Sequence, residues 1–241
     1  MKKTLRYFFS IFFLLLFFAS ANSQTERMKG LRLGFDLSRF ALYYLEPERK
    51  CYEISADFEV VHNIYPTIEY GWQTVKLKQT IQDEMAYNYN SKGSFFKIGL
   101  DYNLLKNLVQ NKYDMVFIGF RGAFANMNHS ADNITVNSGY WGDYTGGIVA
   151  KNSINAYWAE AVGGLRAEIL KNFFMGWSLS GRFMIKKSKD IYMDPINIPG
   201  FGKGNKNSAI GFNYSIYYRI PMFKEKVKPV EEKKNNTKGK K

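Results

Sequence analysis

Two histidines, His62 and His129, are the residues best suited to acid–base chemistry in this chain of 241 residues. His129 is followed by Ser130 and Asp132, so a nucleophilic Ser–His–acid set, as in a lipid hydrolase or acyl transferase, is one interpretation. We expect these three residues in a long loop and His62 in a short turn, and neighbouring loop residues do not form a preorganised triad. We therefore predict no catalytic residue, and we expect a protein that is not an enzyme.

The acidic loop residues and the single cysteine give no stronger signal for a metal site. Asp132 with Asp143, or Asp190 with Asp194, could bind Ca²⁺ between loops, but the spacing of an EF-hand is absent, so solvated carboxylates are the preferred interpretation. Cys51 is the only cysteine, which excludes an intramolecular disulfide and a CxxC zinc site. The sequence predicts no metal and no cofactor.

Two loop motifs remain after these exclusions. The run from Gly200 to Gly204 lacks the spacing of a phosphate-binding P-loop, and we expect a mobile turn there. Tyr140, Trp141 and Tyr144 stand among glycines, where exposed aromatic rings can bind sugars or partner proteins. They can equally enter the lipopolysaccharide interface, and this second interpretation is the one we favour.

Side chains of opposite character alternate along the segment from Asn155 to Ile185, which predicts two long strands around the turn Lys171-Asn172. On the first strand, the odd positions from 157 to 169 share one face, and the even positions from 158 to 168 share the other. These strands exceed the five or six residues that are usual in globular proteins. They match the roughly 9–11 residues with which a tilted strand crosses a bilayer.

The same alternation recurs along the chain and predicts eight strands. The connections alternate in length, since 62–63, 106–112 and 171–172 are short, whereas 40–51, 76–93, 126–154 and 187–207 are long. Short periplasmic turns and long outer loops are typical of outer-membrane barrels. We predict an all-β protein, an eight-stranded antiparallel up-and-down transmembrane β-barrel with both termini in the periplasm. The predicted strands are 30–39, 52–61, 64–75, 94–104, 113–125, 155–170, 173–185 and 208–220.

Composition and charge agree with a barrel. Aromatic residues make up 17% of the chain, with 17 Tyr and 20 Phe, which fits the aromatic girdles of a membrane barrel. Eight strands enclose an interior that side chains fill, so charges there must pair with one another, and we expect no open pore. The charged residues expected to face the lumen are Glu53, Asp57, Glu59, Glu69, Lys97, Asp101, Glu160, Arg166, Glu168, Arg182 and Arg219.

Residues 1–23 have the features of a cleaved secretory signal peptide. Three basic residues precede an apolar segment at 7–18, and small residues follow it, which allows cleavage after Ala21 or Ser23. The apolar segment is short for a transmembrane helix, and an uncleaved anchor is the alternative interpretation. Residues 24–223 are then the predicted barrel.

Residues 224–241 are predicted to be a disordered tail rich in Lys, a solvated spacer or an electrostatic tether to an anionic partner. The net charge of the chain is +13, of which the first six residues supply three charges and the segment from Phe223 onward supplies five. The basic character therefore belongs mostly to the ends, and we expect no nucleic-acid partner.

The sequence also resembles an uncharacterised family of outer-membrane β-barrel proteins of Bacteroidota-type bacteria, known only as a domain of unknown function. The resemblance rests on residues 34–39 (GFDLSR), residues 199–203 (PGFGK) and the Lys-rich tail, and it spans nearly the whole mature chain. It implies the fold and the location, and it brings no functional residues.

We expect a structural or surface-interaction protein that acts through its outer loops. Its expected partners are outer-membrane lipid and lipopolysaccharide, the barrel-assembly machinery during biogenesis, and an unidentified periplasmic or surface partner. Two alternatives stay open: an outer-membrane enzyme that modifies lipid acyl groups, and a soluble periplasmic binder of the lipocalin type.

Overall fold

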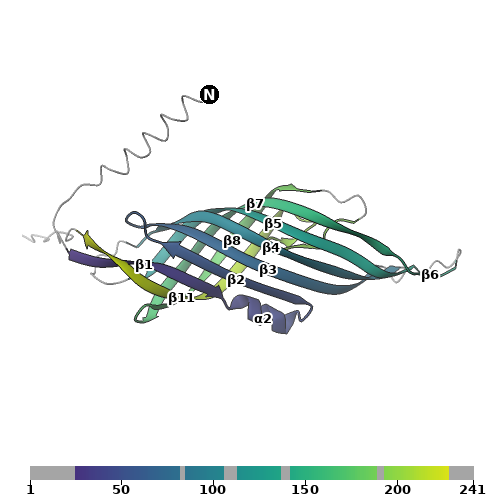
Figure 1. Cartoon of the computed structure of the whole chain (residues 1–241), viewed down its shortest axis with the longest axis horizontal. Coiled ribbons are helices and arrows are strands. Elements are labelled where there is room, and N and C mark those ends of the chain that lie inside the picture. Colours follow the sequence, from purple (N-terminus) through teal and green to yellow (C-terminus); the bar gives the residue numbers. More distant parts are fainter. Residues whose placement is uncertain (1–24, 82–84, 106–112, 137–141, 189–192, 228–241) are drawn as a thin grey trace, which may run out of the picture.

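Eight long antiparallel strands close into a ring in the computed structural model, which describes residues 25–81, 85–105, 113–136, 142–188 and 193–227. Each strand pairs with its neighbour along the chain, and β11 pairs back with β1 to close the barrel (Figure 1). The predicted fold class, an up-and-down antiparallel β-barrel, is confirmed. The eight strands are β1 (Thr25–Asp36), β2 (Arg49–Phe58), β3 (Ile64–Ile81), β4 (Met85–Asn103), β5 (Met115–Val136), β7 (Ile148–Leu170), β8 (Phe173–Lys187) and β11 (Ser208–Val227).

The alternation in the sequence is an alternation between the lumen and the outer surface. On β7, Trp158 is 1% exposed inside the barrel, whereas its neighbour Tyr157 is 45% exposed outside. On β1, Arg32 is buried and Leu33 is exposed. Successive side chains of a strand leave opposite faces, so the polar face lines the lumen and the apolar face lies outside. This arrangement is the reverse of a soluble protein.

The predicted long loop at 76–93 is wrong. β3 continues to Ile81 and β4 begins at Met85, and their pairing is unbroken from Ile64↔Tyr102 to Ile81↔Met85. This stretch has few apolar residues, so alternation did not reveal it. Hydrogen bonds between the two backbones carry the hairpin beyond the apolar part of the wall, and such bonds do not depend on side-chain type.

The predicted loop at 126–154 is also mostly strand. β5 runs to Val136 and β7 starts at Ile148, and the short β6 (Tyr144–Thr145) pairs with the end of β5. Residues 137–141 lie outside the described part of the chain. The hairpins β3–β4 and β5–β7 therefore extend the wall at the end of the barrel where β6 lies (Figure 1).

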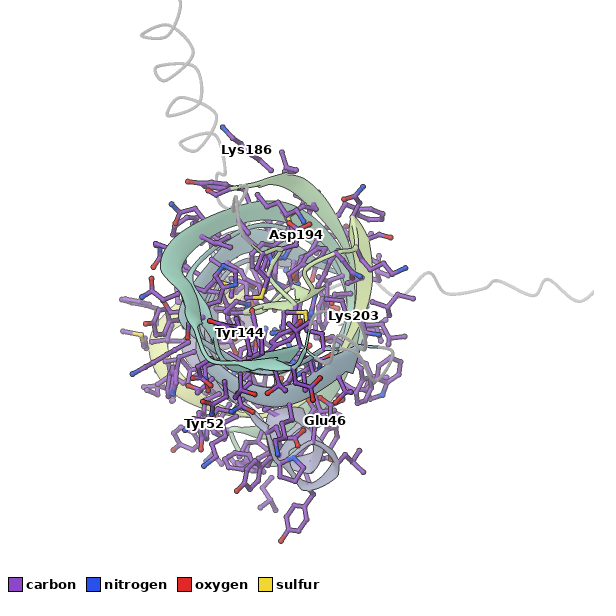
Figure 2. All side chains as sticks on the ribbon, turned by 90° about the vertical axis from the view of Figure 1, so that its right-hand side faces the viewer. Glu46, Tyr52, Tyr144, Lys186, Asp194 and Lys203 are labelled. Atoms are coloured by element: carbon purple, nitrogen blue, oxygen red, sulfur yellow. The ribbon has the colours of Figure 1, made fainter. Side chains whose placement is uncertain are left out.

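A helix, α2 (Ser38–Leu45), replaces the end of the first predicted strand and much of the predicted loop 40–51. It lies against the outside of the ring (Figures 1 and 2). The signal was present in the sequence, since apolar residues at 37, 40, 41, 44 and 45 follow the i, i+3, i+4, i+7, i+8 spacing of a helix.

Two of the predicted short turns are confirmed. The β7–β8 turn is Lys171-Asn172, and Asn172 has a φ of 65°. Asn63, before β3, has a φ of 66°. Asn tolerates this left-handed conformation better than most residues, which suits both turns. The third predicted turn, 106–112, lies outside the described residues.

The connection at 187–207 contains a small hairpin of β9 (Asn197–Ile198) and β10 (Gly202–Lys203). β11 then runs to Val227, where it pairs with Thr25, beyond the expected strand end at Ile220. The expected signal peptide and residues 228–241 of the tail fall outside the described residues. None of the helices within the described ranges is long and apolar enough to cross a bilayer.

Candidate functional site

Ion pairs fill the lumen from wall to wall. Six cations and six carboxylates form one connected set of contacts, contributed by β1, β2, β3, β4, β5, β7, β8 and the start of α2. Equal numbers of the two signs leave this network formally neutral, as a site without bulk water requires. Its members are Arg32, Arg39, Lys97, Arg121, Arg166 and Arg182, with Asp36, Glu53, Asp57, Glu69, Asp101 and Glu160.

Lys97 contacts three of the six carboxylates of this network. Its Nζ lies 3.1 Å from Glu53, 3.0 Å from Glu69 and 3.6 Å from Glu160, and its side chain is 2% exposed. Glu69 is its direct neighbour on β3, while Glu53 and Glu160 come from β2 and β7. One ammonium group therefore ties together carboxylates from three strands.

Arginines connect Glu69 to two further carboxylates, Asp101 and Asp57. Arg121 bridges Glu69 at 2.8 Å and Asp101 at 3.2 Å, and Arg166 bridges Asp101 at 3.0 Å and Asp57 at 2.8 Å. Arg32 completes the chain at 2.7 Å from Asp57. The planar guanidinium group suits such two-partner contacts.

Aromatic rings pack against two of these arginines, Arg32 and Arg166. The guanidinium of Arg166 lies 4.4 Å from the ring centre of Phe117 and 4.7 Å from that of Tyr217, and Arg32 lies 4.6 Å from that of Tyr65. The cavity left within the network has a volume of about 20 Å³. Such a space holds about one water molecule, so the lumen is a packed core rather than a channel.

The mouth of the barrel is closed by the β9–β10 hairpin. Phe201 is fully buried, packs against Trp158 at 5.8 Å between ring centres, and its carbonyl oxygen accepts a 3.1 Å hydrogen bond from Arg182 Nη1. Gly200 has a φ of +75°, and a Cβ there would meet the ring of Phe95 at 2.6 Å. The expected mobile turn at 200–204 is therefore wrong, because the run forms a packed plug.

A larger cavity, of about 790 Å³, lies beside this plug and under α2. Its wall joins residues of α2, the β2 start, the β9–β10 hairpin and the β11 start, which is not a grouping that distance along the sequence suggests. Arg39 bounds it on the α2 side, where it pairs with Glu53 at 2.7 Å and Asp36 at 3.2 Å. Burial opposes the charge of Arg39, but the carboxylates of Glu53 and Asp36 outweigh it and raise the pKa of this guanidinium.

The family of the chain follows from its sequence. A family described as a domain of unknown function, DUF6048, matches residues 4–225. The chain belongs to the DUF6048 family. No curated protein matches the chain.

Three solved barrels resemble this DUF6048 protein. Acinetobacter baumannii CarO2 gives a TM-score of 0.40 at 10% identity over 81% of this chain and 100% of its own. Ail, the attachment invasion locus protein of Yersinia pestis, gives 0.37 at 8% identity over 81% and 98%. Acinetobacter baumannii CarO gives 0.34 at 8% identity over 80% and 98%. At these scores the barrel fold is established by the strand pairing, not by the likeness.

The Ser–His–acid set that was considered as an alternative does not assemble in the structure. His129, expected in a loop, lies on β5, is 1% exposed and stacks edge-on against Tyr89 at 6.0 Å. Ser130 follows it on the same strand and so points to the other face, and Asp132 accepts a hydrogen bond from Asn90 Nδ2. His62 is 55% exposed in its turn. These residues do not form a triad in this DUF6048 barrel.

The other candidates are also dispersed. Asp143 is exposed, and Asp194 lies 3.5 Å from Lys187, while Asp190 lies outside the described residues. Groups of three His, Cys, Asp or Glu that could hold a metal ion are absent from the described part of the chain. Tyr144 is exposed on β6, and Tyr140 and Trp141 lie outside the described residues. Cys51 is buried in the apolar cluster that also contains Trp158 and Phe201.

Sequence analysis found most of the lumen charges but missed four members of the network. Arg32, Asp36 and Arg121 stand on the polar faces of their strands, so alternation alone could have identified them. Arg39 was assigned to the end of a strand, and its pairing with Glu53 depends on α2. No pattern in the sequence indicated the 790 Å³ cavity under α2, which we call the lateral cavity.

Proposed function

We propose that this protein is an integral outer-membrane β-barrel without enzymatic activity that acts as a structural or surface-interaction protein through its loop end. The observation that carries this proposal is the outer surface of the wall, which is apolar around the ring. Large apolar side chains are exposed on every one of the eight strands, among them Leu33, Ile54, Ile68, Ile98, Phe120, Tyr157, Leu179 and Phe212.

Such a surface fits a bilayer and not water. Soluble monomers rarely expose apolar patches larger than a few hundred Å². Here Ile68, Ile98 and Phe120 are 46%, 55% and 63% exposed on the consecutive strands β3, β4 and β5, so the apolar band continues from strand to strand. The charges meanwhile lie inside, where they have partners. A closed barrel also leaves no open sheet edge along its membrane-crossing part.

The packed lumen argues against a diffusion pore, and it supports a role for the ends of the barrel. The β7–β8 turn has two residues, whereas the opposite end carries α2, the extended hairpins and the β9–β10 plug. By the usual asymmetry of outer-membrane barrels, the short turns and both termini face the periplasm. Lipid and lipopolysaccharide then surround the wall, and the barrel-assembly machinery inserts it.

Migration of the membrane fraction on SDS gels, with and without boiling, tests this proposal. A closed membrane barrel resists SDS until it is heated, so unboiled protein should run as a compact band that shifts on boiling. Release of the protein by osmotic shock with no heat-dependent band would contradict the proposal and favour a soluble periplasmic binder.

The enzymatic alternative has its own test. Cells that produce the wild-type protein, a Ser130→Ala variant or no protein should have the same phospholipid and lipid A species by mass spectrometry. A lipid species that depends on Ser130 while the heat-dependent band is retained would instead establish acyl chemistry in the barrel.

A further inference from the structure

The barrel wall is interrupted beside α2. β1 ends at Asp36, which pairs with Ser215, and its pairing with β2 reaches only Phe35↔Ile54. Beyond this level the start of β2, residues 49–53, pairs with β3, and the start of β11, residues 208–214, pairs with β8. The two strand starts face each other across the place that a longer β1 would occupy. α2 covers this gap from outside without burying any of its own residues.

The 790 Å³ cavity lies at this gap, within the roughly 300–1,000 Å³ that is usual for small-molecule sites. One part of its wall is apolar and is formed by Leu37, by α2 and by the start of β11. These residues are Leu37, Leu42, Leu45, Ile210, Phe212 and Tyr214. Because Ile210, Phe212 and Leu45 are also exposed on the outer surface, the apolar wall is continuous with the band that faces the bilayer.

The rest of the wall is strongly basic. Five cations and one carboxylate line the cavity: Arg39, Arg49, Arg182, Lys203, Lys206 and Glu46. Arg39, Arg49 and Arg182 have carboxylate partners, but within the described residues Lys203 and Lys206 have none. The three arginines are therefore compensated by carboxylates, and the two lysines leave a formal excess of two positive charges, which favours an anionic occupant.

Two buried donors at the inner end of the cavity also need acceptors. Arg182 is 5% exposed and Asn197 is 3% exposed, and both line the cavity. Among the described residues, neither Arg182 Nη2 nor Asn197 Nδ2 has a hydrogen-bond partner. A buried donor without an acceptor destabilises the folded protein, and oxygen atoms of a ligand would offset this loss.

We propose that this lateral cavity binds a single-chain anionic amphiphile, with its acyl chain along α2 and its carboxylate or phosphate toward Arg182, Asn197 and the two lysines. The proposal rests on the proposed membrane barrel and gives its loop end a ligand class. Two sources offer this chemistry, free fatty acids and lysophospholipids released from the bilayer. The charge count and the apolar wall suit both.

Binding is measured on the full mature protein in phosphatidylcholine nanodiscs, after the heat-dependent band has verified a closed barrel. Oleate and oleoyl lysophosphatidic acid are titrated, with monooleoylglycerol as the uncharged probe and inorganic phosphate as the probe without a chain. We expect saturable binding of one or both oleoyl anions, and no saturable binding of the other two probes. The preferred anion identifies the source.

Three variants test the location. Ala41 is an exposed residue of α2 that lines the cavity, so the larger side chain of Ala41→Trp should fill the cavity and abolish binding. Lys203→Gln with Lys206→Gln should weaken anion binding about fivefold, as two exposed charges do. Lys76→Gln with Lys78→Gln, exposed on β3 outside this cavity, is the matched control and should bind as wild type does.

Asn197→Leu separates binding from folding, because it removes a buried amide whose Nδ2 has no hydrogen-bond partner in the described residues. We expect unchanged or higher thermal stability without ligand and weaker anion binding. Equal binding of monooleoylglycerol, full binding by Ala41→Trp, or no saturable binding to a heat-modifiable barrel would each overturn the proposal. The last result would leave the proposed barrel function intact, whereas loss of the heat-dependent band would remove that function itself.

Discussion

Lys97 of β4 and Glu53 of β2 form a 3.1 Å ion pair across the intervening strand β3. Oε2 of Glu69, on β3 itself, lies 3.0 Å from the same ammonium group. These side chains are 2–13% exposed, so each charge is stabilised mainly by its partners and not by bulk solvent. The interior of this barrel is therefore a polar core, and its stability depends on complete pairing.

Lys97→Met should destabilise the barrel more than any single surface change. It leaves Glu53, Glu69 and Glu160 without their shared cation, and breaking a buried pair costs about 3–5 kcal/mol. Urea titration of the heat-dependent gel band measures the effect. Lys78→Met, exposed on β3, is the control. An unchanged midpoint for Lys97→Met would show that the network does not support the fold.

Ile98→Arg tests the apolar band. Ile98 is 55% exposed on β4 and is opposite Ile68 of β3. An arginine at the middle of a bilayer costs about 2–4 kcal/mol in a barrel, and less near the interfaces. We expect a smaller fraction of folded barrel after refolding into lipid vesicles. Thr80→Arg, exposed near the end of the β3–β4 hairpin, should refold as wild type does, and equal loss in both would refute a membrane band.

Gly200→Ala should loosen the plug. The φ of +75° disfavours a side chain, and the added Cβ would press on the ring of Phe95 at 2.6 Å. Backbone strain of this type costs about 1–3 kcal/mol. Limited proteolysis of intact barrels in nanodiscs should cut the 193–207 segment faster than in wild type. Gly122→Ala is the control, since its Cβ would meet nothing within 4 Å, and it should resist cleavage as wild type does.

Asn172 makes two contributions to the β7–β8 turn that can be separated. Its φ of 65° suits Asn or Gly, and its Oδ1 accepts a 2.7 Å hydrogen bond from Arg219 Nη2. Asn172→Gly loses the second contribution, and Asn172→Ala loses both. Because the left-handed conformation costs an L-residue about 1–2 kcal/mol, the Ala variant should have the lower urea midpoint. The opposite order would show that the turn conformation contributes nothing.

Local patterns in the sequence determined much of the barrel. The alternation of Trp158 and Tyr157, or of Arg32 and Leu33, separated the side chains of each strand into two faces, because the two-residue period of a strand is a property of its own backbone. The Lys171-Asn172 turn was predictable for the same reason. The charges at strand centres also indicated a paired lumen before any partner was known.

Only the tertiary structure decided which charges pair and what closes the mouth. Lys97 meets carboxylates from three strands because barrel closure and strand register bring them together, and both depend on hydrogen bonds between distant segments. Phe201 is buried because its hairpin folds back into the ring, and Arg39 reaches Glu53 because α2 replaces the end of a strand. The lateral cavity exists for that reason too, since it forms where β1 stops short of its neighbours.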